Sequence, residues 1–290
     1  MASLRDIRKR IVSVKNTQKI TRAMKMVAAS KLRRAQNNLS HATRYTKAYE
    51  GIQAQLSKSV DFSFFPLGKK RESKNTLLII MTGDKGLCGS FNTNLINTGE
   101  QKIKEYRDTD TPLTLITIGK KGQAFFAKKL GGEIQNSFTM DQMFKENLNT
   151  TLVASLINDF LTEKFDTVSI IYGHFNSAIS TTPKIVNLLP LNMKNTENNG
   201  IQSDREPLFE PNKQEVLTSF LEHSVQNAFY MALVHTHVSE ISSRMVAMDS
   251  ATNNAKDLIG KLALDYNRKR QAAITKEMLE IIGGKEALTN

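Results

Sequence analysis

Two long segments without a helix breaker occupy the ends of this chain. Neither Met1–Glu50 nor Asn212–Ile259 contains a glycine or a proline. Globular helices usually run about 8–20 residues, so roughly 50 unbroken residues at each end predict a long rod or a coiled coil. At a rise of about 1.5 Å per residue, each rod would be on the order of 75 Å long. Because the chain must go out and return, we expect the two rods to pair with each other, antiparallel.

A heptad pattern of apolar residues supports this pairing. The a and d positions of the first segment are Leu4, Ile7, Ile11, Val14, Gln18, Thr21, Lys25, Ala28, Leu32, Ala35, Leu39 and Ala42. The matching row of the last segment is Ile241, Met245, Met248, Ala251 or Thr252, Ala255, Leu258 or Ile259, Leu262, Tyr266 and Ala273. The first row is polar near its centre, where the apolar positions slide to Ile20, Met24 and Val27, the drift expected when a straight helix leaves a heptad seam. An ordinary helix bundle is the alternative, but the chain offers no further apolar-faced helices to complete one.

The charge of the chain is one-sided. Lysine and arginine total 40 against 28 aspartate and glutamate, which gives a formal charge of +12. Much of the excess lies on the first helix, where Asp6 is the only acid before Glu50. Its basic residues include Arg5, Arg8, Lys9, Arg10, Lys15, Lys19, Arg22, Lys25, Lys31, Arg33 and Arg34. Such a rod fits an acidic partner, either nucleic acid, an anionic membrane surface or acidic protein loops; a merely solvated face is the weaker explanation.

The cysteine count and the hydropathy pattern indicate the kind of compartment in which the chain resides. Cys88 is the single cysteine, which excludes an intramolecular disulfide and fits a reducing compartment. The best apolar run is Leu77–Met81, far too short to span a membrane. The start of the chain is Arg-rich and acid-poor like a transit peptide, but the heptad pattern already begins at Leu4, so we interpret these residues as structural.

The middle of the chain alternates between strand and helix patterns. Strands are expected at Thr76–Thr82, Leu113–Ile118, Asp166–Tyr172 and Thr182–Leu191, and helices at Asn92–Tyr106, Lys121–Leu130 and Asn147–Lys164. Alternation predicts a mostly parallel sheet covered on both faces, with the proline-flanked last strand at an edge. The expected organisation is an N-terminal coiled-coil helix over 1–58, a small Rossmann-like α/β domain over 74–192, a linker over 193–207 and a C-terminal coiled-coil helix over 208–290. We expect Gly283-Gly284 to end that last helix.

A glycine-rich turn, Gly83-x-x-Gly86-x-x-Gly89, follows the first expected strand. A turn of this kind at the start of a helix can hold a phosphate on its backbone N–H groups. Ser90 and Phe91 stand where a Walker loop has Lys and Ser or Thr, and the spacing is not that of a dinucleotide fingerprint either. We therefore interpret it as a tight turn that needs positive φ or close backbone packing, and keep a nucleotide-dependent enzyme as an alternative.

Other chemistry is sparse in this sequence. His235 and His237 are two positions apart on a helix and cannot chelate one metal together. Zinc-site spacings do not occur, and Cys88 has no histidine partner in the sequence. We expect no catalytic residue, cofactor or metal in this chain.

Three motifs in the sequence are long and distinctive. The first is Ala2–Gln36, around KNTQKITRAMKMVAASK at Lys15–Lys31; the second is GDKGLCGSFN, starting at Gly83. The third is ISSRMVAM, starting at Ile241, followed by YNRKRQAAIT, starting at Tyr266. In these motifs the chain resembles the gamma subunit of F-type ATP synthases, of the bacterial type, and the likeness covers essentially the whole chain.

The resemblance implies a rotating central stalk. In that family the terminal helices form an antiparallel coiled coil inside a catalytic head of alpha and beta subunits, and the middle domain belongs to a foot on the membrane c-ring. Proton-driven rotation of the ring then cycles the catalytic subunits through ATP synthesis or hydrolysis. The chain itself would be non-catalytic and without a transmembrane segment. It would lie on the cytoplasmic side of a bacterial inner membrane as a peripheral protein.

The resemblance also implies contact residues. Met24 and Arg244 match positions that face the catalytic subunits, and Arg270, Gln271 and Thr275 match an upper contact on the final helix. The roles expected for these five residues are those of the matching positions in the family. Phe209 and Glu210 match the foot segment that approaches the c-ring and the epsilon subunit. A basic coiled-coil protein that binds nucleic acid remains the other alternative, disfavoured because no Phe or Tyr interleaves the basic helix before Tyr45.

Overall fold

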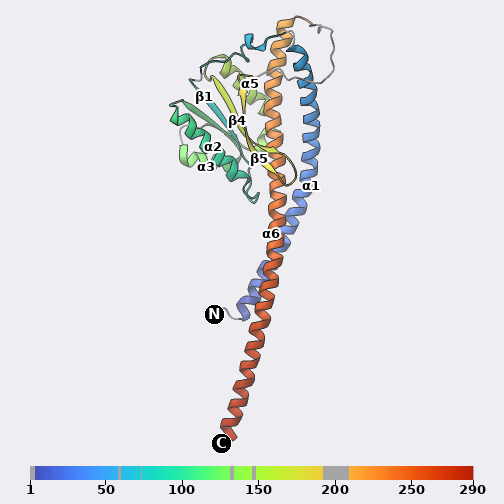
Figure 1. The fold of residues 1–290 in the computed structure, drawn as a ribbon, viewed down its shortest axis with the longest axis vertical. Coiled ribbons are helices and arrows are strands. Elements are labelled where there is room, and N and C mark those ends of the chain that lie inside the picture. Colours follow the sequence, from blue (N-terminus) through green and yellow to red (C-terminus); the bar gives the residue numbers. More distant parts are fainter. Residues whose placement is uncertain are drawn as a thin grey trace. The chain divides into compact units, whose positions relative to one another are not determined.

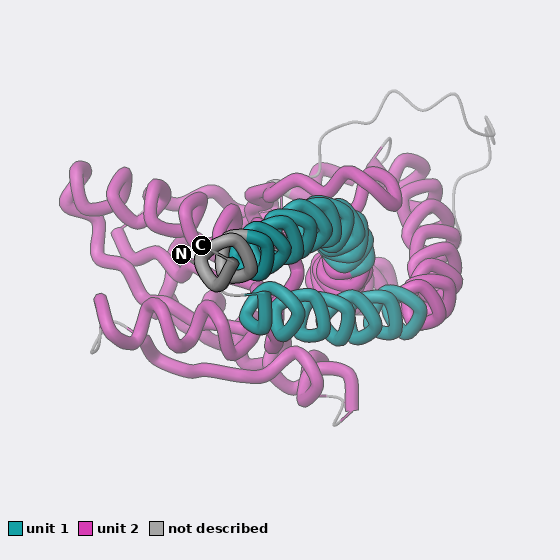
Figure 2. The backbone as a smooth tube through the Cα atoms, turned by 90° about the horizontal axis from the view of Figure 1, so that it is seen from below, with its two compact units in different colours: residues 1–28, 245–290 teal, residues 29–244 magenta. Residues whose placement is uncertain are grey.

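The computed structural model describes residues 4–57, 60–72, 74–130, 134–145, 148–191 and 209–289. It divides into two compact units, one of residues 1–28 and 245–290 and the other of residues 29–244, coloured separately in Figure 2. Two long helices, α1 (Leu4–Leu56) and α6 (Lys213–Thr289), contribute to both units. The expected linker 193–207 lies outside the described residues.

Unit 1 consists of one stretch of α1 and one of α6, and the two run antiparallel. Thr252 Oγ1 donates a hydrogen bond to Thr21 Oγ1 at 2.8 Å, and Lys25 Nζ lies 2.5 Å from the Asp249 carboxylate. The position on α1 rises from 21 to 25 while its partner on α6 falls from 252 to 249. The expected antiparallel pairing of the two end helices is confirmed.

The seam between these helices keeps to the heptad positions, polar residues included. Thr21 is 9% exposed, whereas Ile20 and Val27 are 61% and 57% exposed. The apolar residues Ile20 and Val27 therefore lie outside the seam between the two helices. Thr21 can stay inside because its hydroxyl has a partner across the seam, so that its burial leaves no unsatisfied polar group.

The last helix does not end where the sequence suggested. α6 continues through Gly283 and Gly284 to Thr289, so the predicted stop is wrong. Each glycine costs a helix only about 1 kcal/mol relative to alanine, and the following Lys285, Glu286 and Ala287 are strong helix formers. Two glycines alone do not outweigh such neighbours.

Unit 2 is built on a five-stranded sheet in the order β3-β2-β1-β4-β5. The strands are β1 (Thr76–Met81), β2 (Leu113–Ile118), β3 (Ile134–Phe138), β4 (Thr167–Phe175) and β5 (Thr181–Leu189). The first four are parallel, and β5 pairs antiparallel with β4 at the edge, as the flanking prolines indicated. Register is direct between the central strands, with Ile79 opposite both Ile116 and Ile170. The expected mostly parallel sheet is confirmed.

Helices cover both faces of this sheet. The short helical elements are η1 (Phe62–Phe64), α2 (Phe91–Asp108), α3 (Lys120–Leu130), α4 (Met140–Lys145) and α5 (Leu148–Leu161). Figure 1 shows α2 and α3 on one face and α5 on the other. Alternate residues of β1 therefore enter different cores: Leu78 and Ile80 pack with α2 and α3, whereas Leu77 and Ile79 pack with α5 and α6.

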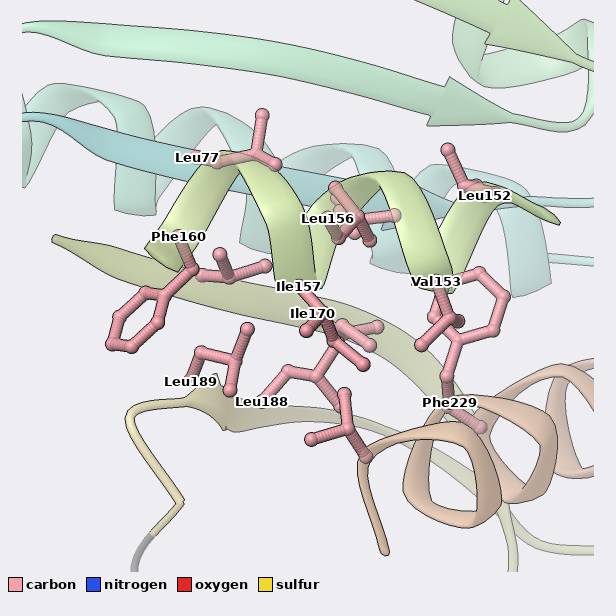
Figure 3. Packing of buried hydrophobic residues seen from close by; sticks show 14 of the residues in the cluster. Leu77, Leu152, Val153, Leu156, Ile157, Phe160, Ile170, Leu188, Leu189 and Phe229 are labelled. Carbon is pink, nitrogen blue, oxygen red and sulfur yellow. The ribbon is translucent and has the colours of Figure 1, made fainter. Parts of the chain in front are cut away.

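The core beneath α5 joins the sheet to the part of α6 in unit 2. The apolar side of α5 faces β4 and β5, and Phe229 of α6 closes the cluster (Figure 3). Phe160 and Phe229 are fully buried. Burying a large apolar side chain stabilises a fold by about 1.5–3 kcal/mol, so this cluster fixes the sheet on the helix.

Candidate functional site

The glycine-rich turn 83–89 lies between the end of β1 and the start of α2. Gly89 has φ 60°, the left-handed region that favours glycine. A Cβ atom at Gly83 would lie 2.8 Å from the Glu240 carboxylate oxygen Oε1, which is closer than real Cβ atoms come to their neighbours. The turn thus uses one glycine for its backbone angle and one for close packing, the two needs that the sequence predicted.

The turn is held by side chains from α2 and α6. The Gly83 N–H donates to Asn92 Oδ1 at 2.8 Å, and Asn92 Nδ2 donates to the Lys85 carbonyl at 3.3 Å. Arg244 Nη2 donates to the carbonyls of Lys85 and Gly86 at 3.3 and 3.2 Å. Two of the turn carbonyls therefore accept bonds from an arginine, an arrangement that suits a cation rather than a phosphate.

Cys88 lies inside this turn as a structural thiol. It is 2% exposed, and its Sγ accepts a hydrogen bond from Asn92 Nδ2 at 3.1 Å. Burial raises the pKa of the Cys88 thiol, and the nearby Arg244 opposes that rise. A buried cysteine with a raised pKa is a poor nucleophile.

Asp84 ties the turn to two further helices. Its carboxylate accepts the backbone N–H of Lys120 at 3.0 Å, at the start of α3, and those of Met140 and Asp141 at 3.2 and 3.3 Å, at the start of α4. A carboxylate at a helix N-terminus satisfies unpaired donors and complements the helix dipole. One aspartate therefore serves two helices at once.

His235 and His237 of α6 have different surroundings. His235 stacks on His174 of β4 with ring centroids 4.3 Å apart, and its Nδ1 accepts the Phe175 N–H at 3.3 Å. His237 instead lies 5.2 Å from the Phe144 ring, with its buried Nδ1 lacking a hydrogen-bond partner. The two do not converge, and within the described ranges no group of three or more metal-ligating side chains comes together.

The sequence-derived contact residues occupy both units. In unit 1, Met24 is half-buried, while Arg270, Gln271 and Thr275 are exposed on α6. The Thr275 hydroxyl bonds back to the Gln271 carbonyl of its own helix at 3.0 Å, so the two neighbours form one local group.

The other contact residues lie in unit 2. Besides the two turn carbonyls, Arg244 Nη2 donates a hydrogen bond to Glu240 Oε1 at 2.7 Å. Phe209 packs partly buried against the core under α5, with Lys213 Nζ 5.7 Å from its ring centroid, and Glu210 is exposed.

Sequence reasoning did not single out Glu240 or Asp84. Asp84 acts through Lys120 and Met140, which are 36 and 56 residues further along the chain, and Glu240 packs against the distant Gly83. The one local signal was the spacing of Glu240 and Arg244, which places both on the same side of a helix.

The described helices include none that is both long enough and apolar enough to cross a membrane.

Comparisons with known proteins agree along the whole chain. An ATP synthase family model matches residues 3–288. The protein is 39% identical to the ATP synthase gamma chain of Trichlorobacter lovleyi and 42% identical to that of Geotalea daltonii, in each case over 99% of both chains.

Solved structures of ATP synthases contain chains with a similar fold. A central-stalk chain of the Tetrahymena thermophila mitochondrial ATP synthase is 27% identical with a TM-score of 0.59, over 80% of this chain and 99% of that one. A chain of the Euglena gracilis mitochondrial ATP synthase, 22% identical, shares the fold with a TM-score of 0.64 over 98% of this chain and 94% of that one. From its sequence relatives above all, this chain belongs to the ATP synthase gamma-chain family.

Proposed function

We propose that this chain, the non-catalytic gamma subunit of an ATP synthase central stalk, works as a rotor. An ion-driven ring in the membrane would turn it, and its helix pair would drive the catalytic subunits through their nucleotide-binding states. The same device would run backwards during ATP hydrolysis.

The antiparallel helix pair of unit 1 carries this proposal. Its seam is closed by contacts within the chain, while seven basic side chains of α1 face outward. They are Arg5, Arg8, Lys9, Arg10, Lys15, Lys19 and Arg22. A basic shaft attracts acidic loops without demanding a defined contact at each angle, which suits a surface that must pass several subunits in turn.

We propose two sets of contacts, one with the catalytic subunits and one with the c-ring and the epsilon subunit. Met24, Arg244, Arg270, Gln271 and Thr275 would face the alpha and beta subunits. The exposure of Arg270, Gln271 and Thr275 supports a contact of the final helix with these subunits.

Phe209 and Glu210 would face the c-ring and the epsilon subunit. Glu210 is exposed next to the anchored Phe209 ring, which supports a fixed outward carboxylate. With these partners the chain would be a peripheral protein on the cytoplasmic side of a bacterial inner membrane.

Single-molecule rotation tests the rotor directly. The hairpin tip at Ile179 is 85% exposed, so Ile179→Cys offers a handle for a bead, while the native Cys88 is 2% exposed. With the catalytic head fixed to a surface, ATP should turn the bead in one direction, and a non-hydrolysable analogue should not. A bead that stays still on a head that hydrolyses ATP at the normal rate would disprove the proposal.

A further inference from the structure

The part of α6 in unit 2 occupies the place where open α/β sheets bind their ligands. Such ligands lie beyond the carboxyl ends of the strands, at the point where the strand order reverses. In the order β3-β2-β1-β4-β5 that point lies between β1 and β4. β1 leads there into the glycine-rich turn, and Gly173 of β4 is bonded to α6 on both sides. Its N–H donates to Thr236 Oγ1 at 3.3 Å, and its carbonyl accepts from Ser239 Oγ at 3.0 Å.

Glu240 and Arg244 continue this contact onto the turn. Arg244 Nη2 lies 2.7 Å from Glu240 Oε1, and both side chains are largely buried, with exposed fractions of 16% and 9%. Glu240 packs against Gly83, while Arg244 reaches the carbonyls of Lys85 and Gly86. The pair therefore binds the turn from two directions, by close packing at its start and by hydrogen bonds at its middle.

The charge pairing makes this contact depend on both residues. If one member of a buried ion pair loses its charge, the other is left as an uncompensated buried charge and turns toward water. Arg244 would then leave the carbonyls of the turn. Among the described residues, the Lys85 carbonyl would then keep side-chain hydrogen bonds only from Asn92 Nδ2 and the Cys88 thiol.

We infer that Glu240 and Arg244 form a latch that holds the glycine-rich turn on α6, so that the sheet and this helix transmit torque as one body. Arg244 is the last residue of unit 2, so the latch sits where α6 leaves the α/β domain. Both are positioning residues. The torque part rests on the rotor function proposed above; the latch itself does not.

Cys88 provides a direct readout of the latch. Its thiol lies within the turn and is 2% exposed, so a maleimide reagent can reach it only when the turn opens. In the full chain, Glu240→Gln keeps the size of the side chain but removes its charge. We expect the labelling rate of Cys88 to rise at least tenfold. Arg244→Lys, which keeps the charge opposite Glu240 but not the reach of the guanidinium, should give an intermediate rate.

A matched control separates the latch from general loosening. Glu105→Gln removes an exposed ion pair with Lys102 on α2 and should leave the labelling rate unchanged. Circular dichroism establishes that each variant is folded. Folded Glu240→Gln protein labelled at the wild-type rate would overturn the latch. If that variant does not fold, Arg244→Lys decides instead, and a wild-type rate there would overturn the latch as well.

Torque is tested in the assembled complex. With Glu240→Gln, the number of ions pumped per ATP hydrolysed should fall at least twofold relative to the Glu105→Gln complex. Faster Cys88 labelling with an unchanged pumping ratio would overturn the torque role. A wild-type complex that hydrolyses ATP without pumping ions would instead be a failure of the proposed rotor function, and the labelling result would still decide on the latch.

Discussion

Gly83 lies against a charged side chain that is itself fixed. The Glu240 carboxylate could give way to a new methyl group if it were free, but its ion pair with Arg244 holds it in place. Gly86, three residues on in the same turn, has room: a Cβ atom there would lie 3.7 Å from the Lys121 side chain, an ordinary contact.

These two glycines should therefore respond differently to substitution. We expect Gly83→Ala to lower the free energy of unfolding by about 1–3 kcal/mol, the usual cost of overpacking. Gly86→Ala should stay within about 0.5 kcal/mol of the wild type. Urea unfolding followed by circular dichroism measures both. Equal stability of the two variants would show that Glu240 does not restrict Gly83.

At the scale of elements, α6 meets the β4–β5 hairpin at a stacked histidine pair. His235 faces His174 and Tyr172 of β4, and Lys184 of β5 lies close enough to affect its charge. Burial, together with His174 and Lys184, lowers the pKa of His235 to about 4, from an ordinary value of 6.5. His235 therefore stays neutral in the folded chain, and its Nδ1 can accept the Phe175 N–H.

The sign of the pH dependence follows from that depressed pKa. Between pH 6.5 and 4, His235 is protonated in the unfolded chain but stays neutral in the folded chain. The contribution of His235 to the free energy of unfolding is therefore fully present above pH 6.5 and is lost as the pH falls toward 4. His235→Gln should flatten this dependence in urea unfolding measured from pH 4.5 to 7. Burial also lowers the pKa of His174 and of His237, so the variant should keep a residual slope. If the free energy of unfolding of the variant falls as steeply with pH as that of the wild type, the pH dependence does not come from His235.

Sequence patterns predicted the elements with strong periodicity and missed the weak ones. Leu113–Ile118 matches β2 at both ends because its sequence, LTLITI, consists of leucine and β-branched residues, which favour strands. β3, with the sequence IQNSF, has polar residues at its centre and lies at the sheet edge, where polar side chains can face water. α4 is only six residues long and depends on Asp84 for its first N–H groups, a contact made by tertiary structure.

At the scale of the molecule, the two end helices were predictable, and the way their seam is satisfied was not. The lack of glycine and proline over Met1–Glu50 and Asn212–Ile259 indicated long continuous helices, and the return of the chain indicated their direction. The pairs Thr21–Thr252 and Lys25–Asp249, however, depend on the register between segments more than 200 residues apart in sequence. Heptad reasoning on one helix places Thr21 and Lys25 on the seam but cannot choose their partners on the other helix.

The outer surface of the same helices gives the last prediction. Arg270 and Gln271 are exposed on α6 in unit 1, as a contact with a neighbouring subunit requires. A hydrogen bond to a charged group contributes about 1.5–3 kcal/mol, which corresponds to a rate change of about tenfold or more. We therefore expect Arg270→Ala to slow ATP synthesis by the assembled complex about tenfold, with the helix content of the isolated chain unchanged. Lys261→Ala, an exposed cation on the same helix, serves as the control and should change the rate by less than twofold. Normal synthesis by a fully assembled Arg270→Ala complex would exclude Arg270 from the contact while leaving the rotor function open, because the basic face of α1 would then have to carry the interaction.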